Sequence, residues 1–225
     1  MTKPATATNS RSRWPSFCVD AASSSSSIRA SKRLRLEGGR IAGVITDRGT
    51  LNADAYVVAL GSAAVRVLRP LGFDLPIYPV KGYSVTIDID ANVPVPRSSV
   101  MDEHYKVMMT RLGTRLRAAG IAELAGDDVS IRASGPATVL RSLRELFPQA
   151  ALACKGGAPN TWAGLRPMTP DGPPYLGATG IANLYLNVGQ GSNGWTQACG
   201  CAQVVTDIVC ERRPQIDIEG FGINR

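Results

Sequence analysis

The sequence lacks any apolar run that approaches the roughly 20 residues needed to span a bilayer. Its longest apolar stretches, such as residues 55–60, have only the length of a strand. No transmembrane segment is therefore expected, and any membrane contact would be peripheral. Histidine is almost absent, since His104 is the only one. Because zinc-type centres need a cluster of His and Cys ligands, no metal site is expected either.

A secretory signal peptide is also missing, and the cysteines form an odd set of five: Cys18, Cys154, Cys199, Cys201 and Cys210. Both features favour reduced thiols over a disulfide framework. The Cys-x-Cys spacing at 199–201 has no second pair beside it, so we do not interpret it as redox or metal chemistry. The chain is expected in the cytoplasm, at most peripheral to the inner membrane.

The net charge of +7 is concentrated at the N-terminus. Residues 1–40 contain eight Lys or Arg and two acids, a balance of +6, which leaves +1 for the remaining 185 residues. A nearly neutral body argues against an extended phosphate-binding face, and no aromatic-rich basic module is present. Nucleic acid is therefore not expected as a partner.

The first 31 residues show no helical or alternating apolar period and include a run of five serines at 23–27. We predict that residues 1–31 are a disordered or non-native segment. An organellar transit peptide would share the Arg- and Ser-rich, acid-poor composition, but it would also need an amphipathic period.

Residues 32–62 predict a β-hairpin followed by a core strand. Two short strand-like runs, at 32–36 and 40–46, are joined through Gly38 and Gly39, which tolerate the positive φ of a tight turn. The apolar run at 55–60 then ends in a Gly-Ser pair, as expected for a buried strand that turns sharply.

The middle of the chain predicts an antiparallel sheet with one wet face, because alternating runs occur at 83–89, 106–110 and 115–119. Pro136 opens a helical pattern that Pro148 is expected to stop. The apolar stripe of this helix comprises Val139, Leu140, Leu143, Leu146 and Phe147. One helix should therefore pack on that sheet.

The last third predicts strands at 162–165 and 184–188, a glycine loop at 189–194 and a helix from Trp195. The expected inner face of this helix comprises Trp195, Ala198, Cys199, Ala202, Val205 and Val209. A glycine turn between a strand and a helix presents free N–H groups to an anionic ligand, although a plain tight connection explains the pattern equally well. No βαβ unit follows, so the G-x-G-x-x-G spacing is not assigned to a pyrophosphate.

Arg166 stands at the end of a predicted strand, before a turn-rich stretch at 167–172. A guanidinium in that position could bind a carboxylate bidentately. A surface or salt-bridge role is the alternative.

A family resemblance rests on four ordered segments. Residues 54–62 are similar to the late AD-x-VV-x-A-x-G motif of FAD-dependent amine and amino-acid oxidoreductases. Residues 78–83, 162–177 and 194–200 resemble the small subunit of bacterial D-amino-acid dehydrogenases. The resemblance runs from about Lys32 to Pro214. It implies an α/β (α+β) fold: the C-terminal part of a Rossmann-like FAD-binding domain and an antiparallel-sheet substrate domain with packing helices.

The resemblance also implies residue roles. Arg166 would clamp the substrate carboxylate, and Tyr105 would lie near the substrate. Lys81 and Gly82 would pass beside the isoalloxazine. The residues expected to border the FAD are Gly61, Ser62, Gly189, Gln190, Gly191, Asn193, Gly194, Trp195 and Thr196. The implied division is 32–79 and 161–225 for the FAD-binding part and 80–160 for the substrate sheet.

Two departures from the family pattern matter. Gln190 stands where the family usually has histidine, so the flavin loop has an amide that cannot titrate. The N-terminal βαβ with its glycine fingerprint does not occur in this sequence. We therefore predict that the 225-residue chain binds FAD weakly or not at all.

The predicted function is FAD-dependent oxidative deamination of small D-amino acids to 2-oxo acids and ammonia, with a quinone or similar respiratory acceptor. Two alternatives stay open. One is an oxidase of the glycine or sarcosine type, and the other is a non-catalytic fragment that does not bind FAD.

Overall fold

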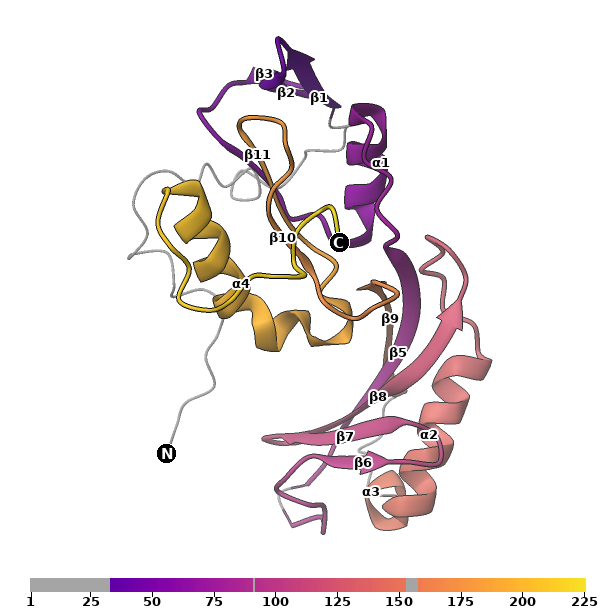
Figure 1. Cartoon of the computed structure of the whole chain (residues 1–225). Helices are drawn as coiled ribbons and strands as arrows, with labels where there is room; N and C mark the ends of the chain where they lie inside the picture. Colours follow the sequence, from indigo (N-terminus) through magenta and orange to yellow (C-terminus); the bar gives the residue numbers. More distant parts are fainter. Residues whose placement is uncertain (1–32, 91, 153–157) are drawn as a thin grey trace.

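A computed structural model describes residues 33–90, 92–152 and 158–225 of the chain (Figure 1). The predicted disorder of residues 1–31 lies outside these ranges. Within them the architecture is mixed α/β, with an antiparallel sheet covered by a helix, which confirms the predicted fold class. No helix of the described ranges is long and apolar enough to cross a membrane.

A five-stranded antiparallel sheet dominates one part of the molecule, with the strand order β6-β7-β8-β5-β9. Its strands are β5 (Tyr78–Asp88), β6 (Val100–Asp102), β7 (Val107–Leu112), β8 (Arg115–Leu124) and β9 (Asn160–Met168). Helix α2 (Ser134–Leu146) lies along one face, and α3 (Pro148–Leu152) follows it (Figure 1). Pro148 thus begins a further helical turn, whereas the sequence predicted only a stop.

Strand alternation decides which face of this sheet is covered. In β5, Tyr83 and Val85 are 1% and 0% exposed and share a core with Val139 and Leu143 of α2. This confirms Val139 and Leu143 of the stripe predicted for the helix, and Leu140 and Phe147 pack against the same core, but the prediction is wrong for Leu146, which is 44% exposed. The neighbouring positions point the other way, to the face opposite α2, which we call the open face. There Trp162 is 58% exposed, in agreement with the predicted wet face.

The other part of the molecule contains two three-stranded sheets. The first joins β1 (Arg33–Glu37), β2 (Arg40–Thr46) and β3 (Gly49–Leu51), and its first hairpin turns at Gly38 and Gly39 with φ of 57° and 77°, as predicted. The second has the order β10-β11-β4, from β10 (Tyr175–Ala178), β11 (Leu184–Val188) and β4 (Tyr56–Val58). Asn183 connects the two, because its side chain bonds both the N–H and the C=O of Ile41.

Strand β4 is shorter and less buried than the sequence predicts. Only three of the six residues at 55–60 pair, in parallel with β11, and Val57 and Leu60 are exposed. The reason is that β4 is an edge strand, whereas a continuous apolar run suggests burial on both sides. The turn after it forms a 3-10 helix, η1 (Gly61–Ala63), which leads into α1 (Ala64–Leu68).

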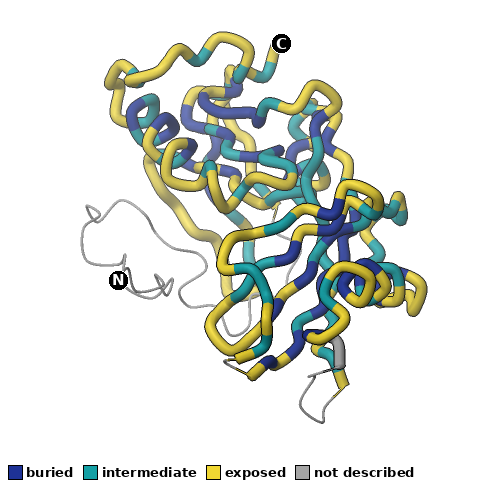
Figure 2. The backbone as a smooth tube through the Cα atoms, turned by 90° about the horizontal axis from the view of Figure 1, so that it is seen from below, coloured by how far each residue is buried: buried dark blue, intermediate teal, exposed yellow. Residues whose placement is uncertain are grey.

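Helix α4 (Gly194–Val209) packs on β10 and β11. Its predicted inner face is partly wrong, since Trp195 is 82% exposed and Cys199 is exposed too. The buried apolar residues are Cys201, Val204 and Val205, which meet Leu176 of β10. Small and apolar residues lie on more than one side of this helix, so their spacing does not fix its rotation. Figure 2 shows the buried residues as dark blue stretches enclosed by exposed yellow ones.

Candidate functional site

Two glycine turns meet the end of strand β9. One is η1, and the other is η3 (Gly191–Asn193), which connects β11 to α4. A Cβ added at Gly61 would lie 3.9 Å from Cγ of Pro167, and one added at Gly191 would lie 3.1 Å from Sδ of Met168. The turns that sequence reasoning assigned to the cofactor therefore lie beside the segment that carries Arg166.

Both turns depend on glycine, because Gly61 and Gly191 have φ of 55° and 58°. The first turn of α4 has no side-chain cap at Asn193 and no acidic residue. The positive end of the helix dipole is thus not offset by a side chain of this turn, which favours an anionic or electron-rich group next to it. Trp195 and Thr196 in this turn are exposed. The place of these residues beside a flavin ring stays a prediction.

Gln190 uses its side chain within its own turn. The amide nitrogen donates to Oδ1 of Asn187 at 2.6 Å. The predicted role of Gln190 beside the FAD remains a prediction.

Arg166 holds an unpaired positive charge on the open face. Its side chain is half-buried, and its guanidinium donates only to two main-chain oxygens, from Nη1 to Ile121 at 2.8 Å and from Nη2 to Gly120 at 3.4 Å. No ion pair joins it to a carboxylate of the described residues. Burial lowers the pKa of this guanidinium, which still remains charged. A carboxylate from outside the described chain would complete its bonding.

The guanidinium lies directly over Gly82, since a Cβ added there would be 2.3 Å from Nη1 of Arg166. Gly82 pairs with Gly164 across β5 and β9. Over Gly164 lies the indole of Trp162, whose Cη2 would be 2.0 Å from an added Cβ. The two glycines therefore form a floor on which a cationic and an aromatic side chain converge. Sequence reasoning did not single out Trp162, although the alternation of side chains along β9 places it on the same face as Arg166, four residues further on.

Lys81 faces the opposite way, towards α2. Its side chain is 0% exposed, and Nζ lies 3.3 Å from Oε1 of Glu123 and 3.2 Å from Oδ2 of Asp128. Burial alone would lower the pKa of this ammonium, but its polar contacts with Tyr83, Asp128 and Glu123 outweigh burial and raise it. Only the backbone at Lys81 is available to the open face. If Lys81 lies beside the isoalloxazine as predicted, only its main-chain atoms can face the ring.

Tyr105 also lies on the α2 side. Its hydroxyl donates to Oε1 of Glu145 at 3.2 Å, and its ring stacks under Arg141. Burial raises the pKa of this phenol. The structure therefore brings Arg166, Gly82 and the two glycine turns together, whereas it places the Tyr105 side chain on the other face of the sheet.

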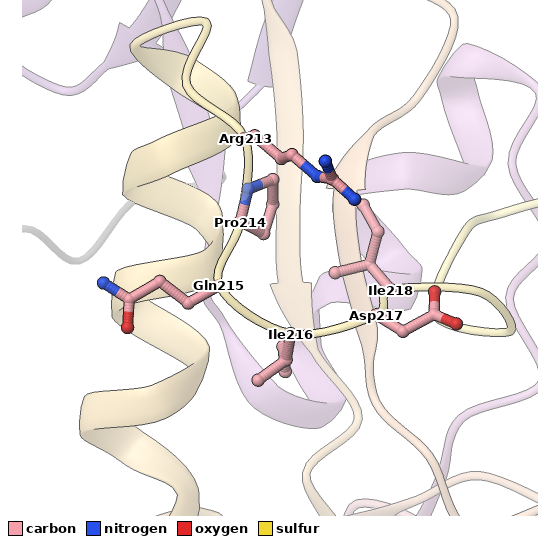
Figure 3. Close-up of a pocket in the computed structure, with 6 residues that line it drawn as sticks. All are labelled: Arg213, Pro214, Gln215, Ile216, Asp217 and Ile218. Atoms are coloured by element: carbon pink, nitrogen blue, oxygen red, sulfur yellow. The ribbon is translucent and has the colours of Figure 1, made fainter.

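A hollow elsewhere on the surface is formed by residues 213–218, which follow α4 (Figure 3). It is built from one continuous segment and includes none of the predicted site residues. The candidate site is therefore the open face at the end of β9.

Comparison with known proteins finds relatives that are named D-amino acid dehydrogenases. The D-amino acid dehydrogenase of Allorhizobium ampelinum is 49% identical over 197 residues, which cover 88% of this chain and 46% of the relative. That of Rhodopseudomonas palustris is 50% identical over 189 residues, which cover 84% and 44%. The chain thus spans a little under half the length of the curated relatives that it matches.

Solved structures share the fold. Glycine oxidase from Geobacillus kaustophilus superposes with a TM-score of 0.78 at 27% identity, covering 87% of this chain and 52% of that one. Iminodiacetate oxidase from a Chelativorans species superposes with a TM-score of 0.77 at 23% identity, covering 85% and 52%. The FAD dependent oxidoreductase family, DAO, matches residues 28–208. With glycine turns and an unpaired arginine gathered at one strand end, the chain belongs to the DAO family of FAD-dependent oxidoreductases.

Proposed function

We propose that this chain forms the substrate-binding half of an FAD-dependent dehydrogenase for small D-amino acids. The observation that carries the proposal is Arg166, a half-buried guanidinium without a carboxylate partner, placed on the open face beside the two glycine turns. The named relatives are D-amino acid dehydrogenases, which gives the substrate class.

Each part of the site has a task in this reaction. Arg166 binds and orients the substrate carboxylate, because a planar fork fixes both the position and the rotation of an acid. The Gly82–Gly164 floor lets the substrate approach the backbone closely. The uncapped N-terminus of α4 favours negative charge next to it.

The residues that would border the cofactor are Gly61, Ser62, Gly189, Gln190, Gly191, Asn193, Gly194, Trp195 and Thr196, with the backbone of Lys81 and Gly82 beside the ring. When bound, FAD accepts the hydride of the substrate Cα–H bond. The amino acid leaves as an imino acid with loss of a proton from nitrogen, and water hydrolyses it to a 2-oxo acid and ammonia. Orientation of Cα by Arg166 is the contribution of this chain.

The electron acceptor would be a quinone or a similar respiratory carrier, with the enzyme in the cytoplasm and in peripheral contact with the inner membrane. The proposal follows the dehydrogenase relatives, since a dehydrogenase passes its electrons to an acceptor other than oxygen. Glycine oxidase, a structural neighbour, supports an oxidase as the second candidate.

The test uses a hybrid enzyme in which residues 33–225 of this chain are joined to the N-terminal portion of the Allorhizobium ampelinum relative. The hybrid enzyme should oxidise D-alanine anaerobically with a quinone or dye acceptor and should leave L-alanine unchanged. Peroxide formation in air would support the oxidase instead. A flavin-loaded hybrid enzyme that oxidises D-alanine under neither condition would refute both.

A further inference from the structure

Strand β8 has a bulge directly beside Gly82. Lys81 pairs with Glu123 and Tyr83 with Gly120, so two residues of β8, Ile121 and Ala122, stand opposite one residue of β5. Ile121 has φ of 65°, a conformation that a β-branched residue rarely adopts. Such a conformation persists only where the surrounding contacts enforce it.

On the open face, the bulge holds the arginine. The carbonyl oxygens of Gly120 and Ile121 accept the hydrogen bonds of the Arg166 guanidinium at 3.4 and 2.8 Å. Since these are the hydrogen bonds that fix the fork over Gly82, the direction of the bulge carbonyls decides where Arg166 points.

On the α2 side, Glu123, the residue after the bulge, forms ion pairs and a hydrogen bond. Glu123 accepts a short hydrogen bond from the Tyr83 hydroxyl, and its Oε1 lies 3.3 Å from Nζ of Lys81 and 3.1 Å from Nη1 of Arg132. Lys81 and Tyr83 are the two residues that flank Gly82 in β5. The Tyr83 hydrogen bond is the main reason that the pKa of Glu123 is lowered, so the carboxylate stays ionised at neutral pH.

The buried charge of Lys81 makes the contacts of Glu123 costly to break. Its buried ammonium needs anionic or carbonyl partners, and it has Glu123, Asp128 and the Ser130 carbonyl, the last at 3.1 Å. Without the Glu123 charge, the ammonium retains partners only on the 128–130 side and no longer pulls on the end of the bulge. The bulge carbonyls would then lose their fixed direction.

From these contacts we infer that Glu123 is a positioning residue for Arg166: it fixes the β8 bulge whose carbonyls aim the guanidinium. The role in catalysis rests on the proposed function of Arg166, but the positioning itself does not. The contacts that support it are those of Lys81, Tyr83 and Arg132 with the one carboxylate.

The experiment measures how fast the Arg166 guanidinium rotates, by arginine side-chain NMR of the 225-residue chain, with Arg166→Lys to assign the signal. Glu123→Gln removes the charge that Lys81 and Arg132 contact, so the bulge carbonyls should hold the guanidinium less firmly and its rotation should become about tenfold faster. Asp127→Asn is the matched control, because it neutralises a carboxylate of the same segment that pairs only with the exposed Arg66. Its Arg166 rotation should equal that of the wild type.

An unchanged rotation rate in folded Glu123→Gln would overturn the inference. Should that variant fail to fold, Arg132→Gln removes one exposed partner of Glu123 and tests the same link. It should accelerate the rotation by a smaller factor, and no acceleration would likewise overturn the inference.

A titration with D-alanine, and with ethylamine as the analogue without a carboxylate, separates this inference from the proposed function. If Arg166 rotates faster in Glu123→Gln while D-alanine leaves Arg166 unaffected in every variant, the positioning holds and the carboxylate role falls. If Arg166 rotates equally fast in the wild type and in Glu123→Gln without ligand, and D-alanine but not ethylamine slows the rotation in both, the positioning falls and the carboxylate role holds.

Discussion

At the scale of single residues, the unpaired charge of Arg166 has a measurable consequence. In the hybrid enzyme, Arg166→Lys should weaken D-alanine binding far more than it lowers flavin content. A charge-assisted bidentate pair contributes about 1.5–3 kcal/mol, so the apparent dissociation constant should rise on the order of tenfold to hundredfold. Rapid-mixing measurement of flavin reduction gives this constant directly.

Ethylamine provides the control for this substitution, because it has no carboxylate for the arginine to bind. Its oxidation should change little in Arg166→Lys. A structural arginine would give a different result, with lower stability and equal losses for both substrates. Unaltered reduction by D-alanine would show that Arg166 has no part in binding.

Gly82 tests the same site without changing any charge. A Cβ in Gly82→Ala would lie 2.3 Å from Nη1 of Arg166, so the guanidinium must leave its place over β5. We expect D-alanine binding to weaken about as much as in Arg166→Lys. Gly164→Ala is the comparison on the same floor: its Cβ would meet the indole of Trp162 at 2.0 Å rather than the guanidinium, so D-alanine binding should weaken less. Equal effects of the two variants would contradict this assignment.

Residue by residue, the sequence predicts those parts of the site that have a local pattern. A glycine turn before a helix, as at Gly189 and Gly191, is such a pattern, and so is an arginine at a strand end. Glu123 has no local pattern, because it acts through a bulge, and the place of Gly82 under the guanidinium depends on the register between β5 and β9. Neither the bulge nor the register can be deduced from spacing along one chain.

At the scale of elements, α2 and α4 show where periodicity is sufficient. Helix α2 has one apolar stripe, and its burial follows the prediction except at Leu146, near the end of the helix, which is exposed. Helix α4 has apolar or small residues around most of its circumference, so packing on β10 decides its rotation and leaves Trp195 exposed. Strand β9 likewise extends to Met168, past Pro167, because it pairs with β5 through that region.

The segment that joins β8 to α2 should make stability depend on acid pH. The N–H of Ser130 is the main cause that lowers the pKa of Asp128 from 3.8 to about 2, with the Ser130 hydroxyl and Lys81 adding to it. Since the folded pKa is the lower one, the stabilisation is present above pH 3.8 and is lost as the pH falls towards 2.

We therefore expect the difference in melting temperature between the wild type and Asp128→Asn to shrink as the pH falls through this window. Asp127→Asn serves as the comparison, because it removes an ion pair between two exposed groups, which contributes little. We would expect a contradiction of this assignment if the difference in melting temperature between the wild type and Asp128→Asn stayed constant from pH 5 to pH 2, roughly the range of carboxylate titration.

At the scale of the whole molecule, the predicted cofactor contacts of the described residues are to the flavin ring, and few are to the pyrophosphate and adenosine of FAD. Among strand pairs in the described ranges, only β4 and β11 run parallel. They are far apart in the chain and do not form a βαβ unit with a glycine fingerprint. A pyrophosphate is normally bound at such a unit, on the N-terminus of its helix. The glycine turns at η1 and η3 leave the adenosine and pyrophosphate without comparable partners.

The 225-residue chain should accordingly bind FAD weakly or not at all, while the hybrid enzyme, which adds the N-terminal portion of a relative, should bind it on the order of a hundredfold more tightly or better. Titration followed by flavin fluorescence measures both constants. Riboflavin is the informative comparison, because it has the ring without pyrophosphate or adenosine: the chain should bind it about as weakly as FAD, whereas the hybrid enzyme should strongly prefer FAD. A stoichiometric flavin absorbance band in the purified chain would refute this prediction, since the described turns would then suffice to hold the whole cofactor.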